Sequence, residues 1–355
     1  MAVITAKLPP QLSPPTRRTS GYLLEVVNLS IEYSIDSQKV ASVDGVTFSV
    51  SPGEIVGVLG ESGCGKTTTA LSLISLLPEN ARVVGGSVWF GGRNLLALPE
   101  AKLREVRGSE VSLVFQDSAV LNPVLRVGTQ IAEVLRAHSR IKGKEARHQI
   151  YSLFEAIGLR EVERIYDAYP HQLSGGQRQR IAFAQALICR PRLVIADEPT
   201  SSVDCATASQ ILAFIKTAAR TDGTAFIVIS HDPEVLSVAD RVVVMYGGQV
   251  VENGPAGDVL ANPLHPYTSA LIQCSPRRAV AISSKAKRRR PYIPGDSPDP
   301  SEAVSGCAFA PRCPNRMPIC DLYNPPLVDE SKNHVVNREA DRGTDHLVRC
   351  FKYGS

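Results

Sequence analysis

The sequence predicts an α/β fold built on a mostly parallel sheet, with polar residues where the strands end. Three short apolar runs, at residues 55–59, 193–196 and 225–229, indicate buried strands. The second and third follow helix-like segments, which favours βαβ units. A glycine-rich loop follows the first run, an Asp-Glu pair the second and a Ser-His-Asp triplet the third. We therefore expect the functional residues at the C-terminal edge of the sheet.

Length and composition set the outer limits. The chain of 355 residues has room for one large domain and an appendage, and 43% hydrophobic residues are enough for a sizeable core. A formal charge of +4 gives no argument for a nucleic-acid partner. No apolar run approaches the ~18 residues of a membrane span, and residues 1–20 lack the apolar stretch of a signal peptide. We expect a cytosolic chain with a disordered tail at 1–20.

The N-terminal elements lead directly into the glycine-rich loop. Residues 23–50 contain short β-like runs, 51–54 form a turn, and 55–59 form the first buried strand. Helix formers occupy 67–77, with no helix breaker before Pro78. Strand, loop and helix thus follow one another in the order that a phosphate-binding loop requires.

The loop itself fits the pattern G-x-x-x-x-G-K-[ST]. Its residues are Gly60, Glu61, Ser62, Gly63, Cys64, Gly65, Lys66 and Thr67, and Thr68 follows within the expected nucleotide-binding segment. Glycines let the backbone N–H groups approach phosphates without a Cβ clash. Lys66 is expected to reach the β- and γ-phosphate oxygens, and the Thr67 hydroxyl to bind Mg²⁺. The helix that begins near Lys66 adds its positive end.

Hydrolysis needs a metal ligand and a group that acts on water. Asp197 ends the second buried strand and is expected to hold Mg²⁺. Glu198, the next residue, is expected to orient and deprotonate the attacking water. His231 follows the third strand and is placed to hydrogen-bond the γ-phosphate. Gln116, after the apolar residues 111–115, is expected to touch both metal and water.

A second rare motif, Leu-Ser-Gly-Gly-Gln at 173–177, lies in a stretch with helical patterning. That stretch covers about 98–186, with helices expected at 128–140 and 148–157, and we interpret it as a helical subdomain inserted in the core. Together with the residues above and 202–204, the motif resembles the nucleotide-binding subunit of an ABC transporter over about 23–254. The resemblance implies a P-loop NTPase with a RecA-like core and an inserted helical subdomain.

The resemblance also implies a head-to-tail dimer of ATPases. ATP would lie between one subunit's phosphate-binding loop and the partner's motif, here Ser174, Gly175, Gly176 and Gln177. Asp204 would communicate across the interface. Tyr33 would stack on adenine, although simple packing is the plain alternative.

Further segments resemble the oligopeptide/dipeptide (and nickel) importers. They are residues 115–125, 262–268, 293–295, 306–313 and 346–350. The implied partners are two transmembrane permease subunits, a second ATPase subunit (a paralogue or a second copy) and, indirectly, an extracytoplasmic substrate-binding protein. The implied location is peripheral, on the cytoplasmic face of the membrane. Two departures occur: the loop after Gln116 is one residue shorter than usual, with Ser118 where proline is common, and Val203 replaces leucine.

Other functions remain as alternatives. They are a soluble ABC ATPase outside transport, an importer subunit for nickel or another small solute, and an unrelated P-loop kinase or GTPase. Soluble ABC proteins usually carry two cassettes or a long coiled coil, and neither occurs here. The guanine-binding motif N-K-x-D is also absent.

The ATPase domain is expected at 21–260 and a C-terminal extension at 261–355. The basic run at 285–290 is a solvated linker or a contact for an anionic membrane surface. Four cysteines cluster beyond it: Cys307, Cys313, Cys320 and Cys350. Their gaps are longer than zinc sites favour, and four thiolates can also hold an iron–sulfur cluster. The resemblance implies that such tails can carry a [4Fe–4S] cluster; zinc and no metal stay open.

Overall fold

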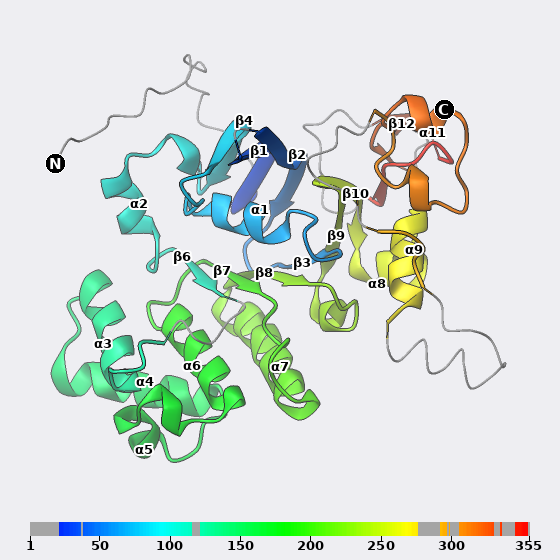
Figure 1. Cartoon of the computed structure of the whole chain (residues 1–355). Coiled ribbons are helices and arrows are strands. Elements are labelled where there is room, and N and C mark those ends of the chain that lie inside the picture. The colour runs from blue at the N-terminus through cyan, green and yellow to red at the C-terminus, as the bar shows by residue number, and fades with distance from the viewer. Residues whose placement is uncertain are drawn as a thin grey trace, which may run out of the picture.

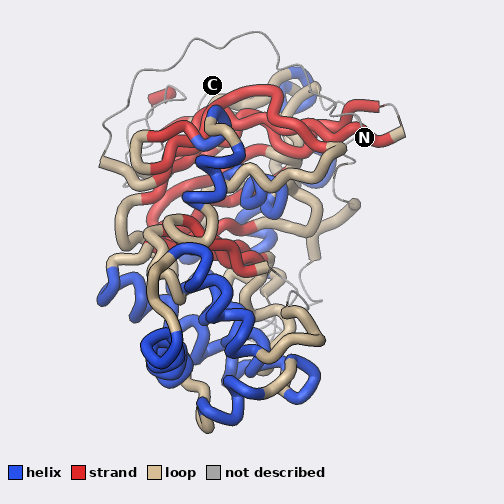
Figure 2. The backbone as a smooth tube through the Cα atoms, turned by 90° about the vertical axis from the view of Figure 1, so that its left-hand side faces the viewer, coloured by secondary structure: helices blue, strands red, loops and turns tan. Residues whose placement is uncertain are grey.

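The computed structural model describes residues 21–36, 38–115, 121–275, 292–296, 298, 305–329, 334–335 and 345–353. Strands occupy the upper part of the molecule in Figure 2, and most helices gather below them. Gln116, Ser118, the basic run 285–290 and the tail 1–20 lie outside the described residues.

The N-terminal strands form an antiparallel sheet of four strands. Their spatial order is β2 (Gln38–Val50), β1 (Leu24–Ile35), β4 (Ala81–Phe90) and β5 (Arg93–Asn94). Alternating residues of β1, such as Leu24, Val26, Leu29 and Ile31, are buried in the core beneath it. The expected turn at 51–54 follows β2, and its Ser51 O accepts a hydrogen bond from the Glu54 N–H at 3.2 Å.

A larger sheet carries the strands that the apolar runs predict. Its parallel part has the order β9 (Arg241–Tyr246), β3 (Ile55–Leu59), β8 (Ala225–Ser230), β7 (Leu193–Asp197) and β6 (Val111–Val114). Every residue of β3, β7 and β8 is buried, as expected for strands covered on both faces. The prediction of a mostly parallel sheet within an α/β fold is confirmed.

Helices cover both faces of this sheet (Figure 1). On one face, α1 (Lys66–Leu73) lies between the two sheets, and its buried residues join the core of β1, β2 and β4. The opposite face packs against a second group of elements: η4 (Val235–Val238), α7 (Cys205–Asp222), α8 (Ala256–Ala261) and α9 (Pro266–Gln273). The molecule is therefore built in layers, and α1 and the glycine-rich loop that precedes it lie between the two sheets.

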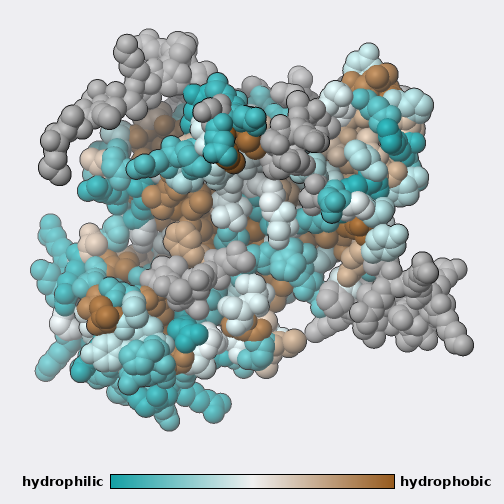
Figure 3. Space-filling model, viewed as in Figure 1, coloured by the Kyte–Doolittle hydropathy of each residue, from teal (hydrophilic) through white to brown (hydrophobic). Residues whose placement is uncertain are grey.

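A helical lobe has a core of its own. It contains α3 (Val127–His138), α4 (Gly143–Ala156), α5 (Val162–Asp167), η3 (Pro170–Gln172) and α6 (Gly175–Leu187). Ile131, Ile150, Phe154 and Ile165 are buried at its centre. In the view of Figure 3 the outer surface of this lobe, at the lower left, is mostly hydrophilic.

The lobe is smaller than the stretch 98–186 that the sequence indicated. The strand β6 lies inside that stretch but pairs with β7 in the large sheet. The preceding elements, η1 (Leu95–Ala97) and α2 (Glu100–Val106), contribute Leu95, Leu103 and Val106 to the core under the N-terminal sheet. Helical periodicity alone did not separate these elements from the lobe, because their buried faces look alike in sequence.

The C-terminal extension continues the large sheet. Beyond β9 come β10 (Gln249–Pro255), β13 (Leu347–Val348), β11 (Val328–Asp329) and β12 (His334–Val335), all antiparallel. Besides α9, the described residues of the extension include two short helices, η5 (Ala310–Arg312) and α11 (Ile319–Leu322). His346 Nε2 also lies 2.8 Å from the fully buried Glu252 carboxylate of β10. In the described part of the chain, no helix combines the length and apolar character needed to cross a membrane.

Candidate nucleotide-binding site

The glycine-rich loop leaves no room for side chains at two of its positions. A Cβ at Gly60 would lie 2.4 Å from the Met245 carbonyl oxygen at the end of β9. A Cβ at Gly65 would lie 2.5 Å from the Ser42 carbonyl oxygen of β2, and Gly65 has a φ of +97°. The loop is thus fixed between the two sheets, with its backbone in a conformation that only glycine adopts easily.

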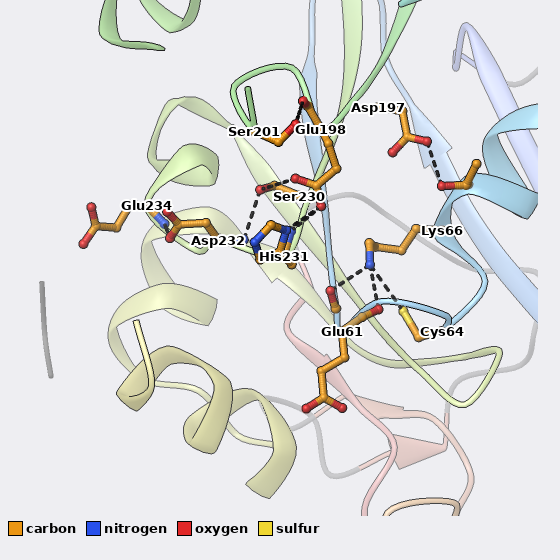
Figure 4. Close-up of polar contacts among 12 residues, drawn as sticks. Glu61, Cys64, Lys66, Asp197, Glu198, Ser201, Ser230, His231, Asp232 and Glu234 are labelled. Carbon is orange, nitrogen blue, oxygen red and sulfur yellow. Dashed lines mark hydrogen bonds and ion pairs between the residues drawn. The ribbon is translucent and has the colours of Figure 1, made fainter. Parts of the chain in front are cut away.

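Lys66 lies inside this loop. Its side-chain amine donates hydrogen bonds to the carbonyl oxygens of Gly60 and Glu61, at 2.8 and 2.7 Å (Figure 4). Only 7% of the residue is exposed. A third contact runs to the Cys64 sulfur at 3.8 Å, so none of these three partners is a carboxylate. An arriving phosphate offers the charge-assisted bonds that this amine lacks.

Thr67 and Asp197, the two expected Mg²⁺ ligands, are brought together. The Thr67 hydroxyl donates to Asp197 Oδ2 at 2.7 Å. Asp197 Oδ1 is buried and accepts no hydrogen bond from any residue that the structure describes. Burial raises the pKa of the Asp197 carboxyl, partly offset by the Thr67 hydrogen bond. A hard divalent cation would satisfy the orphaned oxygen and stabilise the charged carboxylate, so the pair fits Mg²⁺.

Glu198 points toward the end of β8. Its Oε1 accepts a hydrogen bond from the His231 backbone N–H at 3.0 Å and lies 2.7 Å from His231 Nδ1 (Figure 4). Glu198 has a φ of +48°, an uncommon value for a residue with a side chain. Its backbone is fixed by the Ile229 oxygen at 3.0 Å and by the Ser201 hydroxyl, which donates to Glu198 O at 3.0 Å. These contacts hold the Glu198 carboxylate at the end of β8, beside His231.

His231 is the most accessible of these residues, with 59% of its side chain exposed. One ring nitrogen faces Glu198, while most of the ring is open to solvent. Asp197, Glu198 and His231 thus gather at the strand ends, as the sequence indicated. Gln116 lies outside the described residues.

Tyr33 also lies near the loop. Its hydroxyl is 3.3 Å from the hydroxyl of Thr68, and the Ser42 hydroxyl donates to Thr68 Oγ1 at 3.2 Å. Tyr33 is half-buried on β1. Its stacking on adenine stays a prediction.

The motif at 173–177 opens α6 of the helical lobe. Ser174 Oγ accepts a hydrogen bond from the Gln177 N–H at 3.2 Å, and Gln177 Oε1 accepts one from the Ser174 N–H at 2.9 Å. This reciprocal pair is a capping box. A Cβ at Gly176 would lie 3.0 Å from Thr207, whose N–H donates to Asp204 at 2.9 Å. The motif and Asp204 are therefore neighbours on one surface.

Two contacts to the loop were not indicated by the sequence. The Tyr267 hydroxyl accepts a hydrogen bond from the Glu61 N–H at 2.8 Å. Arg312 donates to both oxygens of the Glu61 carboxylate, at 2.8 and 3.1 Å. No local pattern could have shown them, because both residues lie more than two hundred positions from the loop.

The four clustered cysteines do not assemble a metal site. Within the described residues, no group of three or more His, Cys, Asp or Glu side chains is placed to hold a metal ion. Burial raises the pKa of the Cys307 thiol to about 11, with smaller contributions from Cys320, Cys350 and Cys313. The iron–sulfur and zinc hypotheses therefore gain no support from the described residues.

The parallel sheet, the phosphate-binding loop and the adjacent carboxylates define a P-loop nucleoside triphosphatase. The family model described as ABC transporter matches residues 43–201, and that described as oligopeptide/dipeptide transporter, C-terminal region, matches 251–320. The chain belongs to the ATP-binding proteins of ABC transporters, in the group with the oligopeptide/dipeptide C-terminal region, and is an ATPase.

Individual relatives support this assignment along most of the chain. The chain is 42% identical to a probable peptide ABC transporter ATP-binding protein of Sinorhizobium fredii, covering 88% of this chain and 93% of the relative. It is 40% identical to the oligopeptide transport ATP-binding protein AppD of Bacillus subtilis, covering 93% and 97%. A dimeric ATP-binding cassette solved with ADP and Pi matches with a TM-score of 0.61 at 27% identity, covering 66% of this chain and 98% of that one.

Proposed function

We propose that this chain hydrolyses ATP to drive the import of di- or oligopeptides through partner membrane subunits. The observation that carries the proposal is the contact between Thr67 and Asp197 beside Glu198, in a chain that also has the peptide-transporter C-terminal region. Relatives named for peptide transport cover both the ATPase part and the extension. We assign residues 21–260 to the ATPase domain and 261–355 to the extension.

We assign the following catalytic roles, which the contacts described above support. Lys66 and the loop N–H groups bind the phosphates, while Thr67 and Asp197 would hold Mg²⁺, which would neutralise phosphate charge when bound. Glu198 accepts the proton of the attacking water. His231, already hydrogen-bonded to Glu198, positions that carboxylate and donates toward the γ-phosphate. Gln116 completes the proposed set of metal and water contacts.

One chain holds two half-sites that face different nucleotides. Ser174, Gly175, Gly176 and Gln177 belong to the helical lobe, whereas the phosphate-binding loop belongs to the sheet. We therefore assign the motif to the ATP of a second ATPase subunit, which is a paralogue in our proposal. The matched cassette structure is itself dimeric.

The remaining partners are membrane components. Two transmembrane permease subunits would transmit the closing and opening of the ATPase dimer, and an extracytoplasmic substrate-binding protein would deliver the peptide. The chain would then lie peripherally at the cytoplasmic face of the membrane.

A pull-down tests this proposal. Tagged Glu198→Gln protein, which retains ATP, is recovered from native membranes in Mg-ATP, and its partners are identified by mass spectrometry. We expect two polytopic membrane proteins and a second ATPase subunit. Recovery of ribosomal or DNA-repair proteins, or of no membrane protein, would refute the importer. Uptake assays with labelled peptides and with nickel then separate peptide import from small-solute import.

A further inference from the structure

The phosphate-binding loop carries a carboxylate. Glu61 is its second residue, and its backbone carbonyl accepts a hydrogen bond from Lys66 at 2.7 Å. An anion this close to the phosphates is unfavourable, because ATP brings several negative charges to the same loop. Two unit charges within several ångströms of each other near a protein surface repel by a few kcal/mol. A loop that binds ATP therefore needs this carboxylate turned away or neutralised.

In this structure the Glu61 carboxylate is both turned away and paired with a cation. In Figure 4 the Glu61 side chain points away from the Lys66 amine and from Asp197. Its two oxygens accept hydrogen bonds from the two terminal nitrogens of Arg312, at 2.8 and 3.1 Å. This two-point arrangement is the geometry in which arginine binds a carboxylate most strongly.

Arg312 is itself held in place by its surroundings. Only 8% of the residue is exposed. Its Nε donates to the Pro294 carbonyl oxygen at 2.9 Å, and one terminal nitrogen lies 3.3 Å from the Tyr246 hydroxyl. The guanidinium carbon is 5.8 Å from the centre of the Tyr246 ring. Its burial and these contacts hold the Arg312 guanidinium in one position.

The aromatic side chains under Arg312 connect the extension to the loop. The rings of Tyr246, Tyr267 and Phe309 are fully buried, with centroids 4.5 to 5.4 Å apart. From this group the Tyr267 hydroxyl accepts a hydrogen bond from the Glu61 N–H. Glu61 is thus held at its backbone by Tyr267 and at its carboxylate by Arg312.

We propose that Arg312 of the C-terminal extension is a positioning residue of the ATP site, which neutralises the Glu61 carboxylate and keeps it away from the phosphates. The extension is then part of the nucleotide site as well as an addition to the sheet. Substituting Arg312 would weaken ATP binding although no residue assigned to contact ATP is itself changed. The proposal rests on the assignment of residues 60–67 as the phosphate-binding loop.

Binding of ATPγS, a slowly hydrolysed ATP analogue, to the full chain tests the idea. Arg312→Met keeps the apolar stem and removes the charge. We expect its Kd to rise roughly tenfold at low salt, and the difference from wild type to shrink at high salt, because salt screens charge repulsion. Adding Glu61→Gln to that variant should return the Kd to within about threefold of Glu61→Gln alone. A merely structural arginine would show neither the salt effect nor the rescue.

Controls separate the possible failures. Arg316→Ala removes another arginine of the extension, paired with Asp321 at 2.8 Å and with 53% of its side chain exposed, and should leave the Kd unchanged. If Arg312→Met does not fold, Arg312→Gln gives the same comparison. An unchanged Kd, or a weakened one that Glu61→Gln does not restore, would overturn the proposal. Lys66→Ala in the same titration tests the assignment of the phosphate-binding loop. If Lys66→Ala loses ATPγS binding while Arg312→Met binds like wild type, only the proposed role of Arg312 is refuted. If both variants bind like wild type, the assignment of the loop as the nucleotide site is refuted.

Discussion

Acidification should destabilise the C-terminal extension through His265. This residue is 1% exposed, and its Nδ1 accepts the hydrogen bond of the Tyr267 N–H at 3.1 Å as the N-cap of α9. Burial lowers the pKa of His265 to about 4; the nearby Glu252 carboxylate opposes the shift, and the positive charge of Arg349 adds to it. The imidazole is therefore neutral in the folded protein at any pH near neutrality.

The direction and the size of this change in stability with pH follow from the difference in proton binding between the unfolded and the folded chain. Below about pH 6.5 the unfolded chain binds a proton at this residue that the folded chain does not bind until about pH 4. Stability is therefore fully present above pH 6.5 and is lost as the pH falls toward 4. Between pH 7 and pH 5 the loss amounts to about 2 kcal/mol for this single group.

The matched variant is His265→Asn. Asparagine is a good N-cap and keeps an acceptor for the Tyr267 N–H, but it does not titrate. Hydrogen exchange of the α9 amides, followed at pH 7, 6 and 5 and corrected for intrinsic rates, reports the opening free energy of this region. We expect the wild type to lose about 2 kcal/mol more than the variant over this range.

Two results would contradict this reasoning. Equal pH dependence in wild type and His265→Asn would show that another group titrates. A wild type that gains stability as the pH falls would mean that His265 is protonated in the fold, against the effect of its burial.

Three further outcomes are expected at the nucleotide site. Glu198→Gln should lower ATP turnover by about 10²–10⁴-fold while ATP-dependent dimers accumulate in gel filtration, and full turnover would remove Glu198 as the base. Asp197→Asn should raise the Mg²⁺ concentration for half-maximal ATPase activity about tenfold or more, and an unchanged Mg²⁺ titration would contradict the metal pair. Ser174→Ala should lower the free energy of unfolding of the helical lobe by about 1 kcal/mol, because the helix cap is lost, and thermal unfolding measures this change. The same variant should lower dimer-dependent ATPase activity. Unaffected activity would argue against a contact between Ser174 and the partner's ATP.

The placement of most candidate nucleotide-site residues was predictable because the patterns that indicate them are local in sequence. The phosphate-binding loop needs consecutive residues from Gly60 to Thr67, and an apolar run ending in Asp197 and Glu198 indicates a buried strand with its carboxylates at the edge. Parallel strands end at the same edge of a sheet, so the sequence placed Asp197 at the edge that carries the loop. The structure shows that Asp197 reaches Thr67 although β8 lies between β7 and β3.

The boundary of the helical lobe was not predictable at the same level. The sequence placed 98–186 in one subdomain, whereas α2 and β6 pack with the sheets. Amphipathic segments show that a face is buried, but not against which core. The four cysteines give a second example: their spacing allowed a metal site, and the tertiary structure did not assemble one from the described residues.

The sequence by itself determined the class of this protein, its loop, its carboxylates and the motif of its helical lobe, because each is a short pattern with a fixed chemical purpose. Only the tertiary structure decided that β13 extends the ATPase sheet and that Arg312 and Tyr267 hold Glu61. These contacts join residues far apart in the chain. They depend on where packing places whole elements, which no local pattern records.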